Sequence, residues 1–206
     1  MVDCDDWNRF VTAWSGGTTL QFPPCTNPEP TVEATGCRYL TLTPPAGSAS
    51  IAFEVTSDDW LCVVKFVDAN GGLVNDPLFQ TPAEWGIVDV SDALIVPDAR
   101  YNVRAFDGEH LTRRATARTW IWGDADNDGD SDDDDVRLVV DAFHGEFSDL
   151  PYQRVDIASC VPNRAIDFDD VTAVINAAAG IPYAAVCPDP CNHAGEVWAS
   201  PDEASP

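Results

Sequence analysis

Hydrophobic and polar residues alternate in short runs through residues 29–122. The runs are rich in β-branched and aromatic residues, and Pro, Gly, Asp and Asn bound them. Such runs are typical of half-buried β-strands, and several at this spacing predict an all-β sandwich. The runs are RYLTLT (38–43), SIAFEVTS (50–57), LCVVKFVD (61–68), WGIVDVS (85–91), YNVRAFD (101–107) and ATARTWIW (115–122).

The apolar period changes to that of a helix in three other segments. Residues 2–16, 131–145 and 166–180 align without a gap, and each ends in a glycine. Apolar residues fall at i, i+3, i+4 and i+7, which predicts a short helix with one buried stripe that stops at the glycine. The stripe positions are Trp7, Phe10, Val11 and Trp14; Val136, Val139, Val140 and Phe143; and Val171, Val174, Ile175 and Ala178. The repetition indicates one unit used several times.

An acidic loop directly precedes the second of these helices. Residues 124–135 read DADNDGDSDDDD, with acidic residues at loop positions 1, 3, 5, 7, 9 and 12 and Gly129 at position 6. These positions are Asp124, Asp126, Asp128, Asp130, Asp132 and Asp135. Ca²⁺ takes six to eight oxygen ligands, and a glycine at position 6 permits the sharp bend of a calcium loop. A solvated acidic linker is the alternative. The placed glycine and the helix behind the loop favour calcium.

The pair of units at 124–180 resembles a type I dockerin, a duplicated calcium loop–helix module that attaches secreted bacterial proteins to cohesin partners. The resemblance implies two loop–helix units packed about a pseudo-two-fold axis, with bound Ca²⁺ and a protein partner that is either cohesin-like or another domain of the same chain. Dockerins recognise cohesins largely through loop positions 10 and 11, commonly Ser–Thr. This chain has Asp133–Asp134 and Phe168–Asp169 there. The cohesin partner therefore does not carry over, and the chain looks closer to the dockerin-like repeats of bacterial surface proteins.

The second loop departs from the twelve-residue pattern. It runs from Asp156 to Asp170, which is longer than twelve residues, and Arg164 stands where the glycine belongs. The remaining oxygen donors are Asp156, Asn163, Asp167 and Asp170. An arginine at the bend and an insertion that carries Cys160 predict a second calcium site that is weak or empty.

The segment LIVPDARYNVRAF (94–106) is similar to the penultimate-strand signature of fibronectin type III domains. The resemblance implies that Tyr101 is a corner tyrosine, with a buried ring and a hydroxyl bonded to upstream backbone. The chain then divides into five parts. We expect a partial loop–helix repeat (1–16), a linker (17–28), a fibronectin III-like sandwich (29–122), a dockerin-like module (123–191) and a disordered tail (192–206). The first repeat starts at loop position 8, so we expect a fragment of a larger protein.

Charge and cysteine content indicate an extracellular protein. The chain has 35 acidic and 11 basic residues, for a formal net charge of −24. This charge argues against nucleic acid or an anionic membrane surface as partner, and no apolar run is long enough to span a membrane. Seven cysteines suit disulfides in an oxidising compartment. We expect Cys160 to pair across its helix with Cys187 or Cys191, and Cys37 with Cys62 within the sandwich. A fragment would also explain the missing signal peptide.

Catalysis finds little support in the sequence. The three histidines are scattered, and no nucleophile elbow, phosphate loop or HExxH motif is present. Four sandwich tryptophans, Trp60, Trp85, Trp120 and Trp122, could stack on sugars, but core and junction roles are favoured. We therefore predict a non-catalytic calcium-binding assembly or adhesion module. The alternatives are an accessory part of a secreted polysaccharide-degrading enzyme and a carbohydrate-binding module.

Overall fold

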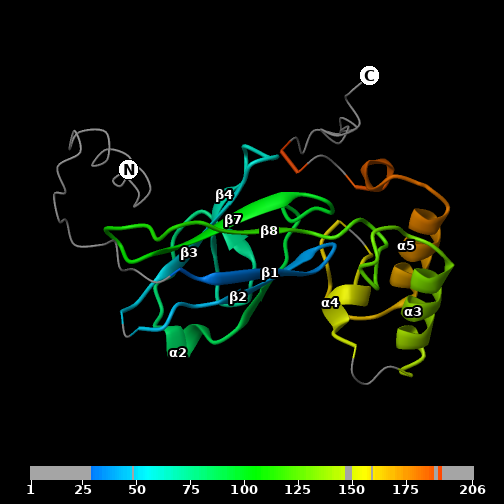
Figure 1. Ribbon diagram of the computed structural model, residues 1–206, viewed down its shortest axis with the longest axis horizontal. Helices are drawn as coiled ribbons and strands as arrows, with labels where there is room; N and C mark the ends of the chain where they lie inside the picture. Colours follow the sequence, from blue (N-terminus) through cyan, green and yellow to red (C-terminus); the bar gives the residue numbers. More distant parts are fainter. Residues whose placement is uncertain (1–28, 48, 147–149, 159, 188–189, 192–206) are drawn as a thin grey trace, which may run out of the picture.

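The computed structural model describes residues 29–47, 49–146, 150–158, 160–187 and 190–191. Two β-sheets form one part of it and a group of helices lies at one end of the sheets (Figure 1). The sheets confirm the predicted β-sandwich. The expected partial repeat, linker and tail (1–16, 17–28 and 192–206) lie outside the described residues.

The smaller sheet has three antiparallel strands in the order β1-β2-β6. They are β1 (Thr31–Gly36), β2 (Tyr39–Thr43) and β6 (Val88–Val90). The sequence pattern does not predict β1, because polar and small residues surround its buried Val32. The segment 85–91 was also predicted as strand throughout, but its first residue ends the short helix α2 (Pro82–Trp85), which Thr81 and Glu84 cap.

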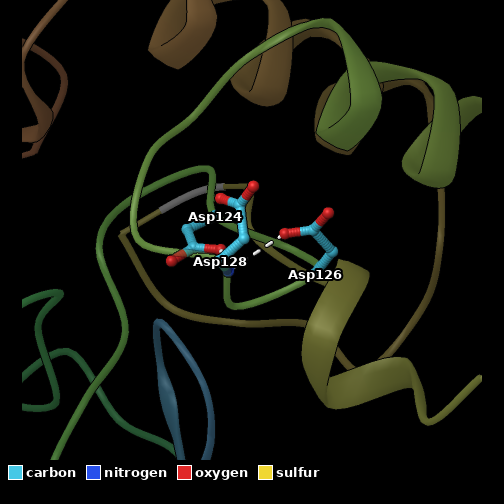
Figure 2. A group of neighbouring side chains, drawn as sticks. All are labelled: Asp124, Asp126 and Asp128. Atoms are coloured by element: carbon cyan, nitrogen blue, oxygen red, sulfur yellow. Dashed lines mark hydrogen bonds between the residues drawn. The ribbon is translucent and has the colours of Figure 1, made fainter.

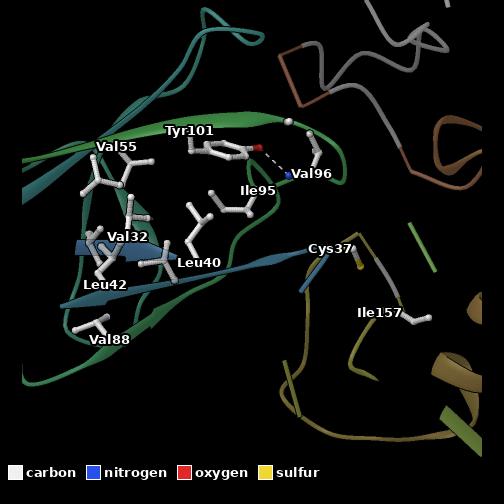
Figure 3. Packing of buried hydrophobic residues seen from close by; sticks show 14 of the residues in the cluster. Val32, Cys37, Leu40, Leu42, Val55, Val88, Ile95, Val96, Tyr101 and Ile157 are labelled. Atoms are coloured by element: carbon white, nitrogen blue, oxygen red, sulfur yellow. Dashed lines mark hydrogen bonds between the residues drawn. The ribbon is translucent and has the colours of Figure 1, made fainter. Parts of the chain in front are cut away.

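The larger sheet has five antiparallel strands in the order β5-β4-β3-β7-β8. They are β5 (Leu73–Val74), β4 (Val64–Val67), β3 (Ala52–Ser57), β7 (Arg100–Phe106) and β8 (Ala115–Arg118). The inner faces of the two sheets contribute Leu40, Leu42, Val55 and Val88 to the core (Figure 3). Trp60 and Trp85 are also buried in it, as predicted.

Tyr101 makes the corner contacts that its sequence context predicts. Its hydroxyl donates to the Leu94 carbonyl oxygen at 2.8 Å. It accepts from the Val96 amide, also at 2.8 Å (Figure 3). Its side chain is fully buried. The hydroxyl thus satisfies two backbone groups of the segment that enters β7.

Helices α3 (Asp133–Phe143) and α5 (Phe168–Ala178) pack against each other beyond the sheets (Figure 1). The predicted stripe is wrong in part: Phe143 is 42% and Ile175 is 49% exposed. The buried stripe instead runs through Val139 and Ala142 of α3 and Val171 and Val174 of α5. Each helix also begins earlier than predicted, two residues before the last loop aspartate, because the aspartate at loop position 9 caps it.

Two short helical turns connect the module to the sandwich. They are α4 (Tyr152–Val155) and the 3₁₀ turn η1 (Tyr183–Ala185). Trp122 packs edge-on against Tyr183 at 5.7 Å between ring centroids, and the Arg154 guanidinium lies 5.0 Å from the Trp120 centroid. Both tryptophans therefore join the two parts of the chain, as expected. They follow β8 rather than lie in it, since that strand ends at Arg118.

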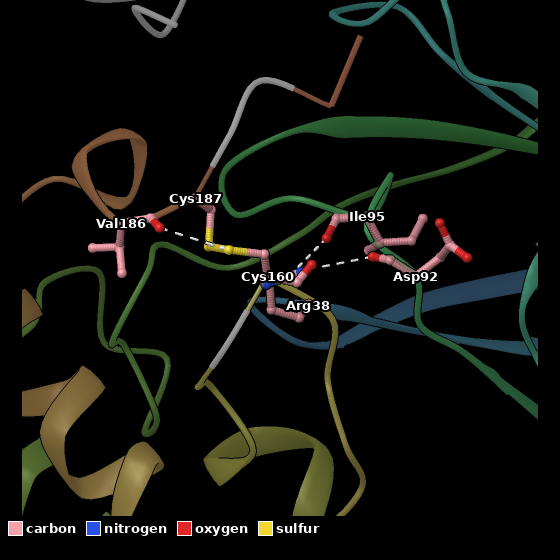
Figure 4. The surroundings of a disulfide bond; sticks show 6 residues. All are labelled: Arg38, Asp92, Ile95, Cys160, Val186 and Cys187. Carbon is pink, nitrogen blue, oxygen red and sulfur yellow. Dashed lines mark hydrogen bonds between the residues drawn. A yellow bond between two sulfur atoms is a disulfide. The ribbon is translucent and has the colours of Figure 1, made fainter. Parts of the chain in front are cut away.

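Two disulfides are present in the described part of the chain. Cys160 pairs with Cys187, one of the two predicted partners (Figure 4). The expected Cys37–Cys62 bridge is wrong, because Cys62 pairs with Cys191 and thereby links the sandwich to the end of the module. Cys37 is a buried free thiol at the junction. None of the helices in the described segments is long and apolar enough to cross a membrane.

Candidate metal centre

All six predicted ligands of the first loop lie in groups of converging carboxylates. Carboxylate oxygens come within 4.8 Å of one another in two groups: Asp124, Asp126 and Asp128, and Asp130, Asp132 and Asp135. Figure 2 shows the first group at the turn of the loop. Among the residues that the structure describes, these are the groups whose oxygens could surround a cation.

Backbone amides hold the first and last carboxylates of this loop in place. Asp124, at position 1, accepts from the amides of Asp128 and Gly129, each at 3.2 Å. Asp135, at position 12, accepts from the amides of Ala125 (2.7 Å), Asp126 (3.2 Å) and Asp132 (2.9 Å). Both carboxylates are almost fully buried. The loop is thus closed on itself from its two ends, and Asp126, Asp128, Asp130 and Asp132 are left at the surface.

The bend of the loop falls where the spacing predicts it. Gly129 has φ of +103°, a backbone conformation that L-residues rarely adopt. A Cβ at this position would meet no atom within 4 Å. The requirement for glycine is therefore one of backbone conformation and not of space.

The carboxylates raise one another's affinity for protons. Loss of hydration and neighbouring aspartates raise the pKa of Asp126, and the pKa of Asp124 is raised mainly by burial. At Asp130 the largest cause of the raised pKa is the charge of Asp128. Such a site favours any cation that neutralises it. Its donors are all oxygens, which suit the hard cation Ca²⁺ rather than a thiophilic metal.

The second loop repeats the hydrogen bonds of the first. Asp170 accepts from the amides of Ile157 (2.9 Å), Ala158 (2.8 Å) and Asp167 (2.8 Å), as Asp135 does from its own loop. Asp156 corresponds to Asp124 of the first loop and accepts from the Arg164 amide at 2.6 Å. Arg164 has φ of +61°, so it occupies the bend in place of a glycine.

The predicted donors of the second loop do not form a three-carboxylate group like those of the first. Asn163 donates to Asp167 at 3.0 Å, and the Tyr39 hydroxyl of β2 donates to Asp156. The other oxygen of Asp156 is buried and has no hydrogen-bond partner among the described residues. Burial raises the pKa of both Asp156 and Asp170, the latter to about 6.

The sequence gives no signal for three residues that hold the loops. The Arg154 guanidinium donates to the Asp126 carbonyl oxygen at 2.9 Å, and Tyr39 and Arg38 reach the second loop from the sandwich. These contacts join residues far apart in sequence. Of the four tryptophans considered as sugar platforms, Trp60, Trp85 and Trp122 are buried and offer no exposed face. Trp120 is partly buried, and the Arg154 guanidinium lies over its ring.

Comparison with known proteins places the chain in no family. No protein-family model matches it, and no curated protein matches it. Five chains of solved structures match, among them one from a computer-based redesign of a β-sandwich protein. That chain is 15% identical, with a TM-score of 0.28, and the match covers 45% of this chain and 90% of the other. The architecture described above therefore rests on this chain's own two sheets.

Proposed function

We propose that this chain is a non-catalytic, calcium-binding assembly or adhesion module of a secreted or cell-surface bacterial protein. One observation carries the proposal: six carboxylates gather in two groups of three within a twelve-residue loop that bends at Gly129 and continues into α3. The loop leads into α3, which packs against α5, and this supports a structural role for the ion.

The residues of the first loop have distinct roles in this proposal. Asp124, Asp126 and Asp128 provide side-chain oxygens, Asp130 its carbonyl oxygen, and Asp132 a contact through water. Asp135 closes the loop and holds its entry through three amides. A bound Ca²⁺ supplies positive charge that offsets the mutual repulsion of the carboxylates. Because the loop leads into α3, binding is coupled to the packing of α3 on α5.

We also propose a weaker ion site in the second loop. Its donors are Asp156, Asn163, Asp167 and Asp170, and its support is the buried oxygen of Asp156 that lacks a partner. In the first loop the corresponding residue, Asp124, bonds the bend amide with one oxygen and joins the carboxylate group. The substitution of Arg164 for glycine and the longer loop account for the lower affinity that we expect.

The fold that we propose combines a fibronectin III-like sandwich with a dockerin-like helix pair. The sheet order β1-β2-β6 against β5-β4-β3-β7-β8 and the Tyr101 corner support the first assignment. The repeated hydrogen bonds of the two loops and the identical capping boxes of α3 and α5 support the second. Two disulfides support an oxidising, extracellular compartment.

The partner that we propose is a protein. The helix pair and the segment after α5 leave Phe143, Phe168, Ile175 and Ile181 between 40% and 68% exposed. We propose that these side chains form one surface patch, since contiguous exposed apolar patches mark contact sites. The net charge of −24 disfavours nucleic acid and anionic membranes.

Calorimetric titration of the full chain with Ca²⁺ tests the proposal. We expect one tight site in the wild type and at least a tenfold loss of affinity in Asp128→Asn. Asp133→Asn is the matched control, because it removes the same charge from an exposed position that is not a predicted ligand. Its affinity should stay within about threefold of the wild type, as expected for a screened surface charge. Equal losses in the two variants would point to diffuse charge attraction, and no binding heat would refute the calcium site.

A further inference from the structure

The side chain of Arg164 leaves the second loop and contacts the sandwich. Its Nη2 donates to the carbonyl oxygens of Asn70 and Asp89, the latter at 3.1 Å. Asn70 lies in the turn between β4 and β5, and Asp89 lies in β6. An arginine with φ of +61° is strained relative to a glycine. These two contacts are the compensation that the structure shows for that strain.

The sandwich turn is shaped to receive this guanidinium. Gly71 has φ of +80°, and a Cβ there would lie 2.9 Å from Arg164 Nη2 and 1.9 Å from the Asp89 carbonyl oxygen. Its own carbonyl accepts from the Ser91 amide at 3.0 Å. Only glycine therefore leaves room for the turn, for β6 and for the arginine at once.

Further hydrogen bonds join the same two surfaces. The Asp89 carboxylate accepts from Gln153 Nε2 at 2.7 Å and from the Tyr152 hydroxyl at 3.2 Å, both from α4. At the turn between β1 and β2, a Cβ on Gly36 would lie 2.0 Å from the Gln153 carbonyl oxygen. The backbones of the sandwich and of α4 are thus in direct contact.

A second arginine crosses the junction in the opposite direction. Arg38, fully buried at the turn between β1 and β2, donates to the carbonyl oxygens of Ile95 (2.7 Å) and of Cys160 in the second loop (2.6 Å) (Figure 4). Its guanidinium also lies 5.2 Å from the centroid of the Tyr183 ring. Arg164 therefore ends on two carbonyls of the sandwich, and Arg38 ties carbonyls of the sandwich to one carbonyl of the second loop. Planar guanidinium groups suit such directional contacts.

We propose that the second loop is a docking surface whose partner is the sandwich of the same chain, and that Arg164 is the residue that gives it this role. Arg164, at the bend where the first loop has Gly129, holds the second loop to the turn at residues 68–72 and to β6, whether or not the weaker ion site is filled. An external protein partner then meets α3 and the outer face of α5, and not the second loop. The proposal goes beyond calcium binding and does not depend on it.

Replacement of Arg164 by glycine separates the backbone strain at this residue from the contacts of its side chain with the sandwich. Arg164→Gly removes the strain of the positive φ and would raise the thermal midpoint if the arginine were only a surface residue. With a docking role, we expect the midpoint to fall by a few degrees. Hydrogen exchange of segments 68–74 and 88–91 should also rise at least severalfold, while exchange in β8 stays unchanged. Asn127→Gly is the matched control, since Asn127 also has positive φ (64°) and is not a predicted ligand.

Two further measurements make the result specific. Arg164→Lys keeps the charge and loses the planar fork, so we expect it to resemble Arg164→Gly in hydrogen exchange. A higher midpoint in Arg164→Gly, with unchanged exchange in the two sandwich segments, would overturn the proposal. Calcium titration of Arg164→Gly should still show the tight site of the first loop. Failure of docking and failure of calcium binding are therefore distinguishable.

Discussion

The Arg154 guanidinium donates to the Asp126 carbonyl oxygen, so α4 bonds directly to the first acidic loop. The two residues before Arg154 bond to Asp89 in the sandwich. A short helical turn therefore contacts both the first loop and β6. Order in the loop is linked through α4 to the position of the sandwich, and a change at either end is expected to affect the other.

Gly129→Ala tests the bend of the first loop. The added methyl group meets no atom within 4 Å, so the expected loss of roughly 1–2 kcal/mol comes from the left-handed backbone alone. Chemical unfolding in excess calcium measures it. Gly47→Ala is the control, because Gly47 also has open space around it and its φ is not positive. Losses of similar size in the two variants would contradict the account of the bend.

Tyr101→Phe tests the corner of the sandwich. The change removes one donor and one acceptor and leaves the Leu94 carbonyl and the Val96 amide without their partner. Because the site is buried, we expect a loss of about 1–3 kcal/mol in the free energy of unfolding. Tyr152→Phe loses one longer bond at a partly buried site and should cost less. An equal or larger loss for Tyr152→Phe would refute the corner role.

Graded reduction tests the two disulfides. Cys62 and Cys191 are exposed, whereas Cys187 is buried. Because exchange requires access of a thiolate to the bridge, the Cys62–Cys191 bond should be reduced at least severalfold faster. Alkylation followed by mass spectrometry measures the order. Labelling of Cys160 and Cys187 before Cys62 and Cys191 would contradict this order.

The pH dependence of the calcium-free protein tests the buried carboxylate of the second loop. Burial raises the pKa of Asp170 from 3.8 to about 6. A carboxyl with a raised pKa contributes stability that is fully present below its ordinary pKa and is lost as the pH rises through about 6. The thermal midpoint of the wild type minus that of Asp170→Asn should therefore fall from pH 4 to pH 7. A signed difference that is constant or rises with pH would contradict the raised pKa.

Local patterns in the sequence are sufficient to predict the first loop, helices α3 and α5, and most strands. Gly129 and the aspartates around it act within twelve residues, so spacing alone indicates their arrangement. The Tyr101 corner is likewise a contact within seven residues. The buried stripe of each helix is predicted only in part. Phe143 and Ile175 lie at the edge of the helix–helix contact and stay exposed.

The junction could not be predicted in the same way. Arg164 and Asn70 are 94 residues apart, and the Cys62–Cys191 bridge spans 129. From the sequence alone, Arg164 is only a departure from the glycine expected at the bend. Its role depends on carbonyl groups in another part of the chain. The expected Cys37–Cys62 bridge kept both cysteines within the sandwich, whereas folding pairs Cys62 with Cys191 and buries Cys37 as a free thiol.

The most direct test of the central claim is the thermal unfolding of the full chain, followed by far-ultraviolet circular dichroism, in millimolar Ca²⁺ and after complete chelation. If calcium holds the first loop, its removal should lower the helical signal and reduce the thermal midpoint by several degrees. Re-addition of Ca²⁺ should restore both, and Asp128→Asn should respond much less. Identical spectra and midpoints with and without calcium would contradict the account.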